Sequence, residues 1–265
     1  MTSRPSTPPP VPAAKLSPPH FNKHLFAFAA IAISVGGMLF GLSNVLEPSG
    51  PLLIAAILIG LAFPAIVLTH RERGAFGVRE LLSDCVRRPR RWWWLPSAAF
   101  VIPVVAWTFS AAIGGARPLT GDLAEFYVVD LIVGALVINI WEEMAWTGYV
   151  QRRAVSRWGI VGGSLVTSLF FTGIHFPFAF DGAAAAREVA TNVSLIAGVA
   201  IGLRLLIARV DPWCGRSLLT VGVLHSSFNA TESLLHPDFD WVRIIVIITF
   251  GICMVAFARR VEREG

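Results

Sequence analysis

The chain has 265 residues, of which 55% are hydrophobic and only 15% charged, with a formal net charge of +5. Soluble domains carry about 25% charged residues, so this composition excludes an ordinary soluble globule. The basic excess is better explained by membrane orientation than by nucleic-acid binding, and we expect no nucleic-acid partner.

The first 22 residues differ in composition from the rest of the chain. Residues 1–20 contain seven prolines and few apolar side chains, which is typical of a disordered, solvated segment. The first apolar run begins near Leu25, and no small-residue cleavage site clearly follows it, which argues against a signal peptide. We therefore expect a disordered Pro-rich cytoplasmic tail at 1–22, a single transmembrane domain at 23–258 and a cytoplasmic tail at 259–265.

Long apolar runs follow this tail. A helix of about 20 residues crosses a hydrocarbon core about 30 Å thick, and lipid offers the backbone no hydrogen-bond partners. The sequence therefore predicts an all-α, polytopic membrane protein with about eight transmembrane helices. The expected spans are residues 25–46, 51–69, 93–113, 123–146, 159–180, 189–208, 217–235 and 241–258.

Lysine and arginine are distributed unevenly between these spans. On this topology 19 of the 22, Arg204 among them, fall on the side of the N-terminus, and three fall on the opposite side. Cytoplasmic loops are enriched in basic residues, so both termini are predicted to be cytoplasmic. We expect a multi-pass protein of the lipid bilayer, in the plasma membrane if the source is prokaryotic.

The fourth expected span carries two adjacent carboxylates, Glu142 and Glu143. Charged groups are costly within a bilayer, so they are candidates for function. Neighbouring residues on a helix point about 100° apart, which predicts different jobs for the two. One can face a cavity as a general base for water, and the other can orient it or bond to a neighbouring helix.

Two later spans carry the other candidates. His175 lies in an apolar span, whereas His225 and Asn229 are four residues apart and share a helical face. The last two can donate hydrogen bonds to a developing oxyanion, or serve as a metal ligand and its support. A single intramembrane histidine is often only an interhelical hydrogen bond, but three clusters on three spans are harder to dismiss.

Taken in order, the three clusters resemble the CAAX-protease and bacteriocin-processing family of intramembrane proteases, also called the Abi family, and its prenyl-protein endopeptidase branch in particular. The family pattern is Glu-Glu, then Phe-x-x-x-His, then His-x-x-x-Asn, which matches residues 142–143, 171–175 and 225–229. The resemblance extends over roughly residues 123–235, the expected catalytic core. It implies an endopeptidase acting on a peptide or protein, with prenylated CAAX termini and bacteriocin-type peptides as the family's substrate classes.

The resemblance also implies roles for the five residues. Glu142 with His175 would activate a water, His225 and Asn229 would stabilise the oxyanion, and Glu143 would orient or support its neighbour. The family has been interpreted both as glutamate-type, with no cofactor required, and as metal-dependent. One zinc ion would take Glu142, His175 and His225 as ligands. The metal-free interpretation is slightly favoured, because Asn229 is a poor zinc ligand and a good oxyanion donor.

One position departs from the family pattern. The first motif commonly continues Glu-Glu-x-x-x-Arg, and this chain has Thr147 at the arginine position. Arg152 and Arg153 lie a turn or more beyond and are candidates to substitute.

Two other functions stay open. One is an ion-coupled membrane transporter, whose buried ionisable groups relay protons or cations. The other is a non-catalytic membrane scaffold or immunity protein, which the departure at Thr147 slightly favours.

Overall fold

The structure is a computed structural model that describes residues 18–46, 49–182 and 185–264. Over these ranges the chain is helical apart from loops and one isolated β-bridge, between Ala116 and Leu235. The predicted all-α fold is therefore confirmed. Residues 1–17, which make up most of the predicted tail, lie outside the described residues.

Several of the helices are interrupted by π-helical segments, here called η1 to η4, and short 3₁₀ segments follow later in the chain. In chain order the elements are α1 (Pro18–Ile31), η1 (Ala32–Gly36), α2 (Gly37–Ser43), α3 (Ser49–Ala55), η2 (Ala56–Ala62), α4 (Phe63–Cys85), α5 (Trp94–Ala112), α6 (Gly121–Val133), η3 (Gly134–Asn139), α7 (Ile140–Glu143), η4 (Met144–Gln151), α8 (Arg152–His175), η5 (Phe176–Phe180), α9 (Ala186–Trp213), α10 (Leu218–Ala230), η6 (Thr231–Leu234), η7 (Pro237–Phe239) and α11 (Trp241–Glu264).

Six helical segments of the described chain are long and apolar enough to cross a membrane. One of them, Gly121–Phe180, overlaps two predicted spans, 123–146 and 159–180, and a kink at Gly159, where φ is 70° and ψ is 177°, separates its two helical parts. The predicted span at 217–235 is occupied by α10, whose 13 residues reach only about 20 Å. The protein is a multi-pass integral membrane protein, whereas the count of eight spans and the cytoplasmic termini stay predictions.

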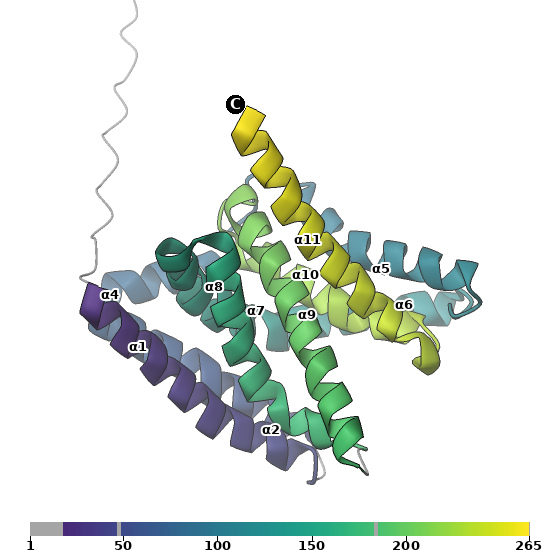
Figure 1. Cartoon of the computed structure of the whole chain (residues 1–265), viewed down its shortest axis with the longest axis horizontal. Coiled ribbons are helices and arrows are strands. Elements are labelled where there is room, and N and C mark those ends of the chain that lie inside the picture. Colours follow the sequence, from purple (N-terminus) through teal and green to yellow (C-terminus); the bar gives the residue numbers. More distant parts are fainter. Residues whose placement is uncertain (1–17, 47–48, 183–184, 265) are drawn as a thin grey trace, which may run out of the picture.

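Apolar side chains cover the exterior as well as the core. α5 exposes Phe100, Val104 and Phe109 on one side and buries Ile102 and Ala106 on the other, as expected of a helix between lipid and protein. One core cluster draws on α5, α6, α9, α10 and α11, and a second on α1, η2, η4 and α8. Figure 1 shows α7 to α10 in the middle of the molecule, with α1, α2 and α4 on one side and α5 and α6 on the other.

α9 packs closely against α11 through two glycines. A Cβ atom on Gly202 would lie 2.8 Å from the backbone of Ile248, and a Cβ on Gly251 would lie 2.5 Å from the carbonyl oxygen of Gly202. Neither position has room for a side chain, as is common where membrane helices cross. This contact at Gly202 holds α9 in place two residues before Arg204.

We expect Gly202→Val to separate α9 from α11 and to lower the free energy of unfolding by about 1–3 kcal/mol. Gly121→Val is the matched control, because a Cβ at that position meets nothing within 4 Å. The control should change stability by less than about 0.5 kcal/mol. Unfolding in detergent measures both, and equal stability of the two variants would contradict the close packing.

Candidate active site

The Glu-Glu pair lies on α7, a single α-helical turn between the π-helical segments η3 and η4. A π-helical turn holds an extra residue and shifts the side chains that follow, and such turns are frequent at functional sites. Both carboxylates point into the protein: Glu142 is 4% exposed and Glu143 is fully buried. Each carboxylate therefore needs hydrogen-bond partners inside the protein, and the two differ in the number of partners that they have.

Glu143 is surrounded by donors. Arg204 on α9 donates to both carboxylate oxygens, with Nη2 2.5 Å from Oε1 and Nη1 3.0 Å from Oε2. The hydroxyl of Thr147 also donates to Oε2, and Nδ1 of His225 lies 2.8 Å from Oε1. A carboxylate has about four acceptor positions, so these contacts use all of them. Glu143 therefore has no acceptor position left for a water molecule.

Glu142 is held at one oxygen only. The side-chain amide of Asn139 donates to its Oε2 over 3.0 Å, and Nδ1 of His225 lies 3.8 Å from the same oxygen. Oε1 makes no hydrogen bond to any residue in the described ranges. This oxygen can accept a hydrogen bond from water, which is the position that a general base requires.

His225 connects the two carboxylates from α10. Its ring is 4% exposed, and Nδ1 donates to Glu143, which fixes the orientation of the ring. Only Nε2 then remains to accept or donate a proton. A catalytic histidine held by a carboxylate in this way is a common arrangement in hydrolases.

Phe171 joins the second motif to the rest of the site. The Nδ1 atom of His175 lies 2.8 Å from the carbonyl oxygen of Phe171, and the two rings stack with centroids 4.1 Å apart. The Phe171 ring also lies 6.0 Å from the ring of His225 and 5.1 Å from the guanidinium carbon of Arg204. The phenylalanine of Phe-x-x-x-His thus contacts both histidines, and Nε2 of His175 is the ring nitrogen without a hydrogen bond to the described residues.

Asn229 lies one turn after His225 on α10. Its side chain is exposed and makes no hydrogen bond to another residue that the structure describes. The structure therefore brings Glu142, Glu143 and His225 into one cluster and connects His175 to it through Phe171. Asn229 is left outside the cluster with its amide unused.

Arg204 is the site residue that the sequence prediction misplaced. We expected it on the cytoplasmic side, but its side chain is fully buried within α9. The positive-inside count becomes 18 against three, so the predicted orientation still follows from it. The available signal was its apolar neighbourhood inside the expected span 189–208, since an intramembrane arginine is a functional candidate.

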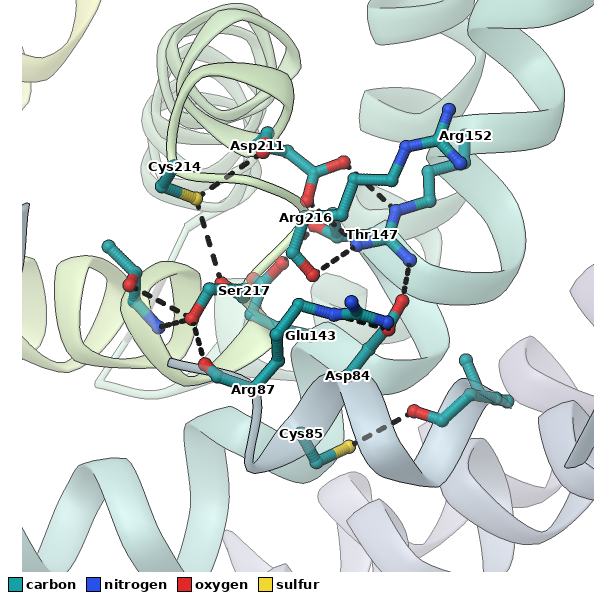
Figure 2. A network of polar contacts seen from close by, with 12 residues as sticks. Asp84, Cys85, Arg87, Glu143, Thr147, Arg152, Asp211, Cys214, Arg216 and Ser217 are labelled. Atoms are coloured by element: carbon teal, nitrogen blue, oxygen red, sulfur yellow. Dashed lines mark hydrogen bonds and ion pairs between the residues drawn. The ribbon is translucent and has the colours of Figure 1, made fainter. Parts of the chain in front are cut away.

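The two arginines expected to substitute at the Thr147 position serve other carboxylates. Figure 2 shows Arg152 between Asp84 and Asp211, and its Nε lies 2.9 Å from the Asp211 carboxylate. Arg153 pairs with Glu72 over 2.6 Å. The expectation that either arginine replaces the one missing from the family motif is therefore wrong.

The predicted zinc ligands do not form a metal site in this structure. In the part of the chain that is described, no three His, Cys, Asp or Glu side chains are grouped so as to hold a metal ion. Nδ1 of His225 bonds to Glu143 and Nδ1 of His175 to the Phe171 carbonyl oxygen, so each ring keeps Nε2, the nitrogen that a metal-bound histidine would use. A zinc ion held by Glu142, His175 and His225 therefore stays a prediction, since it would need the three groups to converge at about 2 Å.

The fold and the site together define a polytopic helical membrane protein with a buried carboxylate–histidine cluster. Residues 124–231 match a family model described as Type II CAAX prenyl endopeptidase Rce1-like. This segment is similar to the CAAX-protease family, as the resemblance of its motifs predicted, and all five predicted site residues lie inside the matched segment. A search among curated proteins finds no match.

Proposed function

We propose that the protein is an intramembrane endopeptidase of the CAAX-protease type in which Glu142 activates the attacking water. The observation that carries this proposal is the difference between the two adjacent carboxylates. Glu143 is bonded at every acceptor position, whereas Glu142 keeps one oxygen without a partner among the described residues. Only Glu142 can accept a hydrogen bond from water without breaking an existing contact.

In the proposed reaction, Oε1 of Glu142 takes a proton from water as the water oxygen attacks the peptide carbonyl carbon. The carbonyl electron pair moves onto oxygen and forms a tetrahedral intermediate. Glu142 then passes this proton to the amide nitrogen, the oxyanion re-forms the carbonyl, and the C–N bond breaks to release the amine and the new carboxyl terminus. Nε2 of His175 hydrogen-bonds the same water and orients it together with Glu142. Nε2 is the nitrogen available for this, because Nδ1 is bonded to the Phe171 carbonyl oxygen.

The oxyanion needs donors on the other side of the carbonyl. Asn229 offers an exposed amide without a partner in the described chain, and His225 offers Nε2 when its ring is protonated. Their separation of one helical turn on α10 lets both face a single substrate group. In this proposal no step uses a metal ion.

The name of the matched family model suggests the substrate. We propose a peptide or protein ending in a prenylated CAAX sequence, in which the prenyl group is anchored in the bilayer and the peptide bond after the modified cysteine is cut. A multi-pass protein with an apolar exterior meets such a lipid-anchored substrate in the membrane plane.

The proposal is tested by cleavage in proteoliposomes. Purified wild-type protein is mixed with a farnesylated CAAX peptide or its unprenylated counterpart, and products are identified by mass spectrometry. We expect release of the residues after the prenylated cysteine by the wild type, with and without a chelator, and none by Glu142→Gln. Solute or proton flux without cleavage of either peptide would favour a transporter instead.

A further inference from the structure

We propose that Arg204 is the positioning residue of the Glu-Glu pair and replaces, from a different helix, the arginine that the family motif places at position 147. This inference rests on the proposed function, because it assigns Arg204 to the same site. The motif arginine would lie four residues after Glu143, one turn along the same helical segment. In this chain that position is Thr147, and the positive charge comes from α9, 61 residues away from Glu143 in the sequence.

The contacts place the Arg204 guanidinium next to position 147. Its Nη1 lies 3.0 Å from Glu143 Oε2 and 3.4 Å from the hydroxyl oxygen of Thr147. Thr147 itself donates to the same carboxylate oxygen and is only 1% exposed. The short threonine side chain therefore leaves room for a guanidinium from the neighbouring helix, and the two side chains together supply three donors to one carboxylate.

The surroundings of Arg204 hold it in this position. Its backbone carbonyl oxygen accepts hydrogen bonds from the side chains of Gln151 at 2.5 Å and Ser164 at 3.2 Å. Its guanidinium lies over the ring of Phe171, which also packs on His175. Two-point contact fixes the plane of the Glu143 carboxylate, and this places Oε1 against Nδ1 of His225.

This arrangement predicts that one guanidinium is required and that two cannot be accommodated. Arg204→Ser removes the clamp on Glu143, and Thr147→Arg adds a second positive charge in a fully buried space. Each single variant is expected to lose about 100-fold in kcat, with KM changing little, because the carboxylate is no longer correctly placed. The double variant Thr147→Arg, Arg204→Ser moves the charge to the family's position and should recover most of that loss.

The experiment compares cleavage by the wild type, both single variants and the double variant in proteoliposomes, together with their thermal unfolding in detergent. Arg187→Ser is the matched control, because it removes an exposed arginine from the same helix. Recovery of kcat in the double variant supports the inference when folded Arg204→Ser is itself slow, since a purely structural role would reduce the folded fraction and leave the kcat of the folded protein unchanged. If Arg204→Ser fails to fold, a folded and active double variant still shows that an arginine at position 147 can take the place of Arg204.

Two results would overturn the inference: full activity of folded Arg204→Ser, or a double variant that folds or cleaves no better than the single variants. Glu142→Gln in the same assay separates this from the proposed function. The proposed function, and the inference with it, is wrong if Glu142→Gln cleaves as fast as the wild type or if the wild type does not cleave. An inactive Glu142→Gln beside an active Arg204→Ser sinks the inference alone.

Discussion

Replacing Glu142 with glutamine is expected to lower kcat by about 10²–10⁴-fold, the usual contribution of a general base, without unfolding the protein. Glutamine has nearly the same shape, and its carbonyl oxygen can still accept the hydrogen bond that Asn139 donates to Glu142. What it lacks is the negative oxygen that takes the proton from water. Steady-state cleavage of the prenylated peptide measures the loss.

Asp130→Asn is the control for this experiment. Asp130 is an exposed carboxylate on α6, the helix that leads through η3 to the Glu-Glu pair. Its amidation should leave kcat within about twofold of wild type, because it touches none of the site residues. Comparable losses in the two variants would show that removing any carboxylate from this helical segment lowers activity, and the general-base role of Glu142 would then be abandoned.

The sequence predicts local features of this fold well. Membrane helices are long apolar runs, so the predicted spans coincide closely with the observed helices. The kink at Gly159 separates two helices where the predicted span 159–180 begins, whereas α10 is shorter than its apolar run suggests. The Glu-Glu pair, His175 and His225 were identifiable because each is a polar residue in an apolar span.

The sequence predicts poorly which side chains meet across helices. The contact between Arg204 and Glu143 depends on how α9 packs against η4 and α8, and no local pattern encodes that packing. The same holds for the different hydrogen bonding of the two carboxylates. Helical periodicity predicts that they point in different directions, but only the structure shows that Glu143 is fully bonded while one oxygen of Glu142 has no partner among the described residues.

The buried pair of Glu143 and Arg204 leads to a second large expected effect. Glu143→Leu should lower the free energy of unfolding by about 3–5 kcal/mol, because it leaves the Arg204 guanidinium charged and buried without its partner. Both side chains are fully buried, so solvent cannot compensate. Equilibrium unfolding in detergent measures the change, and a loss below about 1 kcal/mol would show that other groups neutralise Arg204.

The double variant Glu143→Leu, Arg204→Met separates stability from chemistry. Replacing a whole buried ion pair with apolar residues of similar volume is often neutral or stabilising, so this variant should regain most of the stability lost by Glu143→Leu. It should nevertheless remain inactive, since nothing then holds Nδ1 of His225 or orders the carboxylate next to Glu142. A stable double variant with wild-type kcat would mean that the pair is needed only for folding. A stable but inactive double variant would mean that apolar packing can replace the ion pair in folding, and that the two charges are needed for catalysis.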